Sequence, residues 1–108
     1  DDEVAKAAWR AATAVVPAGQ EGDLAATLAT QFNRGDRHMR HSLSRALVSL
    51  GDAALPAIRA AQANSDEGVR EHATATARML ADPDTDFDVA VAEAQRTVAL
   101  LGAPLTDG

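Results

Sequence analysis

The chain contains no cysteine, and only three of its 108 residues are aromatic, namely Trp9 and two phenylalanines. Without cysteine it can form no disulfide bond, no thiolate metal site and no thiol nucleophile. The scarcity of aromatic side chains removes the usual platforms on which nucleic-acid bases stack. No apolar run approaches the length that spans a bilayer, so we expect no membrane insertion. The missing cysteine also fits a reducing compartment, and we expect the protein in the cytoplasm.

Positive charge is scarce as well, because ten Lys and Arg residues face sixteen acids and leave a net charge of −6. This balance argues against a general affinity for nucleic acid. Alanine is abundant, with 26 of the 108 residues. It is the best helix former, and the four prolines lie where helices should start or stop. The composition therefore predicts an all-α chain, which we treat as a single domain over residues 1–108.

A short pattern occurs three times along the chain. The segment that begins at Asp2 returns at Asp36 and again at Asp66, each time with an apolar residue two or three positions later. Aligning Val4, Met39 and Val69 gives spacings of 35 and 30 residues (39 − 4 and 69 − 39). Such a period is typical of stacked helical units, in which no unit buries its apolar face alone. The repeat therefore predicts an α-solenoid.

Apolar periodicity and turn residues predict about six helices. They cover residues 2–16, 24–32, 37–50, 53–63, 67–80 and 86–101. We expect aspartates to cap four of these helices, because a carboxylate accepts hydrogen bonds from the free N–H groups of a helix start. The four capping residues are Asp23, Asp36, Asp52 and Asp66. Gly51 is expected to end the third helix with a positive φ.

Each long helix is expected to bury one apolar stripe. The stripes are Val4, Ala8, Ala11 and Val15; Met39, Leu43, Ala46, Leu47 and Leu50; Val69, Ala73, Thr76, Ala77 and Leu80; and Phe87, Val91, Ala94, Val98 and Leu101. Trp9 flanks the first stripe. We expect it to pack against a preceding unit or the loop after Pro17 rather than to anchor a partner.

The helices group into repeat units. Residues 1–17 form the inner helix of an incomplete unit, residues 22–51 and 52–82 form complete units, and residues 84–102 form a capping helix. Because the first unit lacks its outer helix, we expect the native chain to extend before residue 1. The uncovered end also offers an apolar surface for homodimer formation.

Three local features of the second complete unit carry a resemblance to a known family. They are Gly51, the segment Leu55-Pro56-Ala57-Ile58 and the pattern Asp66-x-x-Val69-Arg70. The preceding unit shares Asp36-x-x-Met39-Arg40 and Leu47-x-x-Leu50-Gly51. Residues 2–82 thus resemble HEAT repeats of the short bacterial kind that also occurs in phycobilin lyases. The resemblance implies a right-handed α-solenoid of antiparallel helix pairs. It departs from the family at Arg34 and Asn64, where the family often has an aspartate that links neighbouring units.

In such a stack the inner helices line a concave surface. Inner-helix positions opposite the apolar stripes carry six basic residues, which we call the basic strip: Lys6, Arg10, Arg37, His41, Arg45 and Arg78. Guanidinium groups match carboxylates and phosphates. We therefore expect the strip, with Arg37, His41 and Arg45 at its centre, to bind a protein partner or an acidic peptide. The alternative is an ordinary solvated face with local ion pairs.

No motif in the chain indicates catalysis, and we expect no catalytic residue, cofactor or metal. His38 and His41 have a spacing that a metal can bridge, but we expect them to be solvated. The acidic segment 82–88 is interpreted as helix capping. We expect an interaction scaffold that is not itself an enzyme. Two alternatives stay open: a ligand-handling or lyase-like accessory domain, and a structural or regulatory arm of a multidomain protein.

Overall fold

The computed structural model describes residues 2–102, and this part of the chain is all-helical, as predicted. It contains six α-helices: α1 (Asp2–Val15), α2 (Glu21–Ala29), α3 (Arg37–Ser49), α4 (Leu55–Gln62), α5 (Glu67–Ala81) and α6 (Phe87–Gly102). A short 3₁₀ helix, Gly51–Ala54, precedes α4. Residues 1 and 103–108, which the sequence analysis included in the single domain, lie outside the described part.

Two of the four predicted aspartate caps are confirmed. Asp36 accepts a hydrogen bond from the backbone N–H of Met39 at 2.9 Å, and Asp66 accepts one from Val69 at 3.2 Å. Both carboxylates satisfy an N–H group that has no partner within its helix. Gly51 has a φ of +66°, as expected for a residue that ends a helix.

The predicted caps at Asp23 and Asp52 are wrong. The second helix already begins at Glu21, so Asp23 lies inside its first turn. Asp52 belongs to the 3₁₀ helix, and α4 begins three residues later at Leu55. In both places the chain enters the helix through helical or near-helical backbone, which leaves no extended residue to act as a side-chain cap.

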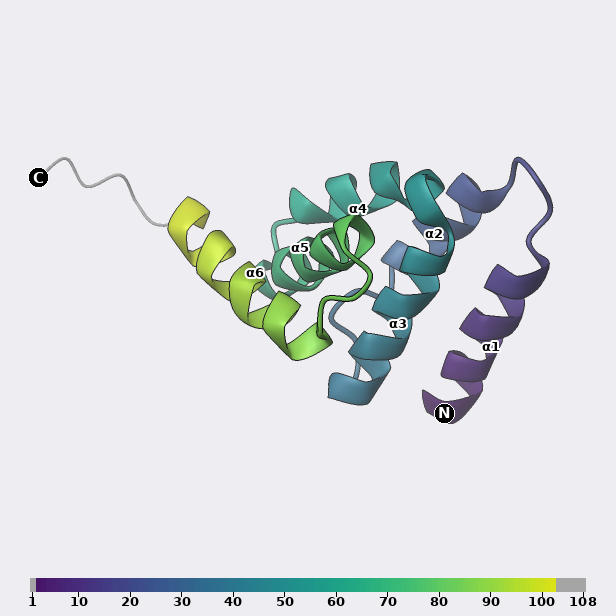
Figure 1. The fold of residues 1–108 in the computed structure, drawn as a ribbon, viewed down its shortest axis with the longest axis horizontal. Helices are drawn as coiled ribbons and strands as arrows, with labels where there is room; N and C mark the ends of the chain where they lie inside the picture. Colours follow the sequence, from purple (N-terminus) through teal and green to yellow (C-terminus); the bar gives the residue numbers. More distant parts are fainter. Residues whose placement is uncertain (1, 103–108) are drawn as a thin grey trace, which may run out of the picture.

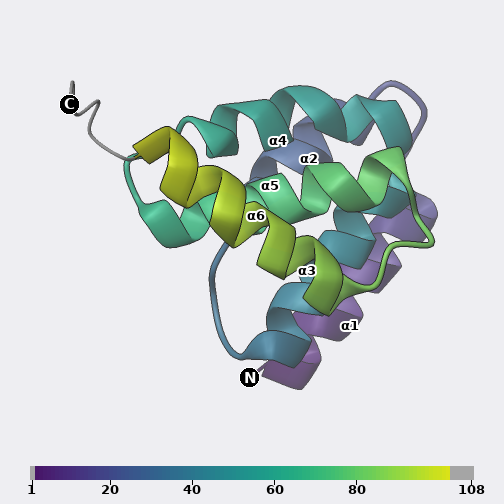
Figure 2. The same ribbon diagram turned by 60° about the vertical axis from the view of Figure 1, so that its left-hand side comes forward.

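The helices form two layers (Figure 1). In one layer α1, α3 and α5 are neighbours in that order, and in the other α2 packs beside α4. The helix α6 packs along α5 and closes the end of the row opposite α1, and Figure 2 shows it crossing in front of α5. Helix α3 is therefore the only member of the row with a row neighbour on both sides among the described residues.

The main core lies between α1 to α5, and a smaller apolar cluster joins α5 to α6. The predicted stripe of α3 is confirmed: Met39, Leu43, Ala46 and Leu47 are buried and Leu50 is partly buried. In α6, Phe87, Ala94 and Val98 are buried as predicted. Leu101 is 81% exposed instead, and it borders an open cavity beside Gln62 and Arg70.

The predicted stripe of α1 is wrong. Val4 and Val15 are 66% and 75% exposed, and Ala8 and Ala11 are exposed as well. The buried residue of α1 is Trp9, which joins the main core. Because α1 carries alanine on almost every side, periodicity cannot select a face. The large indole ring gains most from burial and decides the rotation of the helix. Trp9 therefore packs, as expected, but inside the core rather than against a further unit.

Candidate functional site

The structure divides the basic strip between two sides of α3. Arg37 and Arg78 face α6, Arg10 and Arg45 border the space between α1 and α3, and His41 lies at the border of both. Lys6 forms an ion pair with Glu3 at 2.7 Å, and its side chain is only 19% exposed. The six residues are therefore not one continuous surface.

On the α6 side the arginines have acidic partners. The Arg37 guanidinium donates to both carboxylate oxygens of Asp88, at 2.7 and 2.9 Å. Its hydrogen bonds lower the pKa of Asp88 and raise the pKa of Arg37. Arg78 donates to Glu93 at 3.0 Å and lies 3.8 Å from Asp82. The sequence predicts helix capping for the acidic segment 82–88, but it does not reveal the pairing of Asp88 with Arg37.

His41 joins the two sides. Its ring stacks on Phe87 of α6, with the ring centroids 4.8 Å apart and the planes 17° from parallel. Burial is the main cause that lowers the pKa of His41, and the cations Arg45 and Arg37 lower it further. The imidazole is therefore mostly neutral at neutral pH. It is partly buried rather than fully solvated, which corrects the expectation for this histidine.

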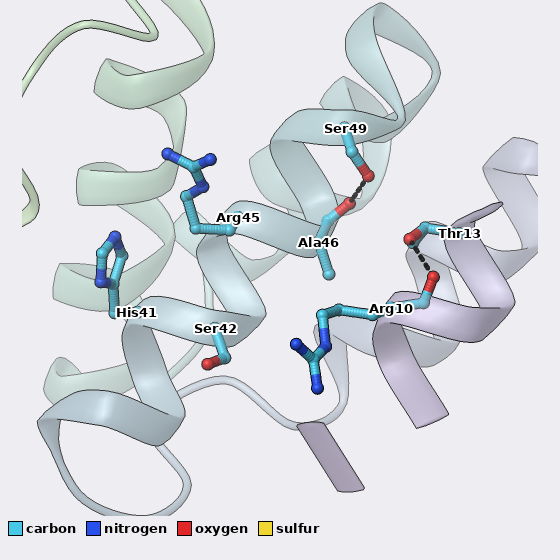
Figure 3. A pocket seen from close by; sticks show the side chains of 7 residues that line it. All are labelled: Arg10, Thr13, His41, Ser42, Arg45, Ala46 and Ser49. Atoms are coloured by element: carbon cyan, nitrogen blue, oxygen red, sulfur yellow. Dashed lines mark hydrogen bonds between the residues drawn. The ribbon is translucent and has the colours of Figure 1, made fainter. Parts of the chain in front are cut away.

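The space between α1 and α3 is a cavity of about 390 Å³, which we call the α1–α3 cleft (Figure 3). Its lining residues are Arg10 and Thr13 from α1 and His41, Ser42, Arg45, Ala46 and Ser49 from α3. Figure 3 shows Arg10 reaching from α1 towards Ser42, while His41 and Arg45 project from successive turns of α3. The lining contains basic, hydroxyl and alanine side chains but no acid.

The spacing along α3 explains how the cleft is built. His41, Arg45 and Ser49 are four residues apart and therefore share one side of the helix, with Ser42 beside them. Arg10 is the residue of the first repeat that aligns with Arg45 (45 − 35). The sequence thus predicted the three basic residues of the cleft. It missed Thr13, Ser42 and Ser49, although the regular spacing of 41, 45 and 49 would have found Ser49.

The guanidinium groups of the two cleft arginines, Arg10 and Arg45, form no salt bridge or hydrogen bond within residues 2–102. Glu3 of α1 acts on Arg10 through Coulombic attraction. The Ser42 hydroxyl makes no hydrogen bond to another described residue either. Thr13 and Ser49 donate to carbonyls of their own helices, Arg10 O at 3.1 Å and Ala46 O at 2.6 Å. The cleft thus offers unpaired cationic donors beside hydroxyl groups.

A second polar cluster is buried between α3 and α5. The N–H of Asn33 donates to Nδ1 of His72 at 2.8 Å, which places the ring proton on Nε2. That nitrogen lies 2.9 Å from the carbonyl of Arg40 and 3.0 Å from the Ser44 hydroxyl. Ser44 in turn lies 2.8 Å from Thr76, whose hydroxyl donates to the carbonyl of His72. Each side chain of the cluster thus has a hydrogen-bond partner, and the cluster joins α3 to α5.

This cluster is not a catalytic dyad, although it pairs a serine with a histidine. Ser44 and Thr76 are fully buried and His72 is 5% exposed, so no substrate reaches the hydroxyl. Burial lowers the pKa of His72 to about 4, which keeps the imidazole neutral. The cluster therefore has a structural role, and the sequence analysis did not identify it.

The described residues contain no group of three or more His, Asp or Glu side chains placed to hold a metal ion. None of the helices between residues 2 and 102 combines the length and the apolar character that crossing a membrane requires. No protein-family model, no curated protein and no solved structure matches the chain.

Proposed function

We propose that the chain is a right-handed α-solenoid of antiparallel, HEAT-like helix pairs that binds an acidic segment of a partner protein in the α1–α3 cleft. The order of the row α1, α3, α5, with α2 and α4 in a second layer, supports the solenoid. The confirmed Asp36 and Asp66 caps support it too, because they occupy equivalent positions in successive units.

One observation carries the docking role: Arg10 and Arg45 line one cavity that has no acid in its lining, and neither forms a salt bridge within residues 2–102, in a chain whose net charge is −6. Acids are plentiful elsewhere, and they pair with Lys6, Arg37 and Arg78. Two guanidinium groups left unpaired at one place therefore form a local positive region on an acidic molecule. A ligand that carries carboxylates gains charge-assisted hydrogen bonds there.

The surrounding negative charge gives the cleft selectivity. An acidic segment is repelled by most of the surface and attracted by the cleft, so electrostatics favours one docking position. Because Arg10 and Arg45 are exposed, this attraction weakens as salt shortens the Debye length, which is roughly 8 Å at physiological ionic strength. Binding in the cleft is therefore expected to fall with added salt.

The test uses two variants with the same change in net charge. Arg10→Glu/Arg45→Glu reverses the cleft, whereas Arg59→Glu/Arg96→Glu reverses two exposed arginines of α4 and α6 outside it. Fluorescence anisotropy measures the binding of a labelled glutamate–alanine peptide, with a lysine–alanine peptide as the specificity control. We expect the first variant to lose binding and the second to retain most of it.

Circular dichroism of both variants checks that their helix content and melting temperature stay close to those of the parent chain. Equal weakening in the two variants would show that only overall charge matters, and it would remove the α1–α3 cleft as the docking site.

A further inference from the structure

The charge in the α1–α3 cleft is better matched by a dianion than by a single carboxylate. The lining contains the two guanidinium groups of Arg10 and Arg45 and no acid. One carboxylate neutralises one guanidinium and leaves the other unpaired. A phosphate monoester carries about −1.5 to −2 charges near neutral pH and three acceptor oxygens, so it balances both arginines.

The hydroxyl groups provide further donors of the right kind. The Ser42 hydroxyl has no hydrogen-bond partner among the described residues and lies near Arg10 in the lining (Figure 3). Thr13 and Ser49 form bonds only to carbonyls of their own helices, and their hydroxyl hydrogens can rotate towards a ligand. Donors from both α1 and α3 thus line the cleft.

The size of the cleft fits a phosphorylated residue together with its neighbours. A volume of about 390 Å³ falls within the range of ligand pockets, roughly 300–1,000 Å³. A free phosphate ion would fill only a small part of it. Part of the lining is apolar, contributed by Ala46 and by the aliphatic portions of the arginine side chains. This leaves room for the backbone and adjacent side chains of a peptide.

His41 couples the cleft to pH. It is faced by the cations Arg37 and Arg45 of its own helix, by Asp86 just before α6, and by Asp88 and the Phe87 ring of α6. It shares the lining of the cleft with Arg10. A bound dianion adds negative charge to this balance and favours the protonated imidazole. Binding of the dianion is therefore expected to raise the pKa of His41.

Building on the proposed docking role, we propose that the α1–α3 cleft recognises a phosphoserine or phosphothreonine residue in an acidic segment of the partner. The phosphate lies between Arg10 and Arg45, with the Ser42 hydroxyl as an additional donor. The flanking residues of the segment occupy the remainder of the cleft. Docking through this face is thus controlled by phosphorylation of the partner.

The test compares three short peptides that differ only in their central residue, which is phosphoserine, glutamate or serine. All three have the same flanking residues, composed of glutamate, aspartate and alanine. Fluorescence anisotropy gives the Kd of each for the parent chain and for Arg10→Glu/Arg45→Glu. We expect the phosphoserine peptide to bind about tenfold tighter than the glutamate peptide, because it engages both arginines rather than one. The double variant should remove this preference. Arg45→Lys, which keeps the charge but loses the planar fork, should reduce it in part.

The outcomes separate this inference from the docking role. Equal Kd values for phosphoserine and glutamate, both weakened in the double variant, would overturn phosphate recognition and leave acidic docking intact. Absence of binding for every peptide would overturn both. Inorganic phosphate that competes as strongly as the phosphoserine peptide would identify a free-anion site and overturn the peptide assignment.

Proton NMR provides an independent measurement, because the chain has only three histidines and their ring signals can be followed separately. We expect the phosphoserine peptide to raise the pKa of His41. An unchanged pKa of His41 at saturating peptide would place the phosphate outside the cleft.

Discussion

The two interfaces that α3 forms within its row are built differently. Towards α5 the contact is closed by a buried hydrogen-bond cluster around His72, and α6 adds the Arg37–Asp88 pair and the stacking of Phe87 on His41. Towards α1 the contact depends on Trp9, and beside it the α1–α3 cleft remains open. Trp9 in α1 and Ser44 in α3 occupy equivalent repeat positions. Trp9 buries an apolar side chain there, whereas Ser44 forms buried hydrogen bonds.

This difference explains why one part of the basic strip is available and the other is not. The acids of α6 reach Arg37 and Arg78 because α6 packs along α5. Among the described residues no acidic helix packs on the α1 side, so Arg10 and Arg45 form no salt bridge there. The acids of α6 therefore pair with Arg37 and Arg78 within the chain.

The largest expected effect comes from breaking the α1 interface. Trp9→Ala removes the main apolar contact of α1 and should lower the free energy of unfolding by about 3–5 kcal/mol. Urea denaturation followed by circular dichroism measures this change. Val4→Ala, on the same helix but 66% exposed, is the control and should change stability by less than about 0.5 kcal/mol. A similar loss in both variants would mean that Trp9 has no special role.

The α5 interface should be sensitive to acid. The pKa of His72 is about 4 in the folded chain and near its ordinary value of 6.5 in the unfolded chain. Between these values the unfolded state binds a proton that the folded state does not bind. The stabilisation is therefore complete above pH 6.5 and is lost as the pH falls towards 4. The loss amounts to about 3 kcal/mol, because each pKa unit corresponds to about 1.4 kcal/mol.

Urea denaturation at a series of pH values measures this loss, and His72→Gln is the variant that lacks the titrating group. Its stability should depend less on pH over the same interval. His41→Gln controls for the other histidine whose pKa is lowered. If the pH dependence of His72→Gln equals that of the parent chain, the buried cluster is not the source of the acid sensitivity.

The smallest effect is expected at the ion pair between α3 and α6. Both Arg37 and Asp88 are substantially exposed, at 45% and 65%, so solvent screens their attraction. A double-mutant cycle with Arg37→Ala and Asp88→Ala should give a coupling free energy close to zero at physiological salt. Arg37→Ala should nevertheless raise the pKa of His41, because it removes a neighbouring cation. Proton NMR titration measures this shift, and a lowered pKa would contradict the electrostatic interpretation.

The sequence predicted the basic residues of the candidate site, but it did not predict which of them lie together and which pair with acids. The repeat spacing identified Arg10 and Arg45 as equivalent residues, and both line the cleft. The same reasoning placed Arg37 at the centre of the strip, whereas it pairs with Asp88, which is 51 residues away along the chain. The buried His72 contacts the backbone of Asn33 across 39 residues. Neither contact leaves a local signal, because no periodicity connects the residues involved.

The sequence by itself determined where most helices begin and end. Asp36, Asp66 and Gly51 act on backbone groups within a few residues of themselves, so their effects do not depend on the rest of the fold. Tertiary structure alone decided which side of α1 is buried and which arginines remain unpaired. An alanine-rich helix has no strongly preferred face, and an exposed arginine pairs with whichever acid the packing brings near. Both outcomes depend on contacts that only the assembled layers provide.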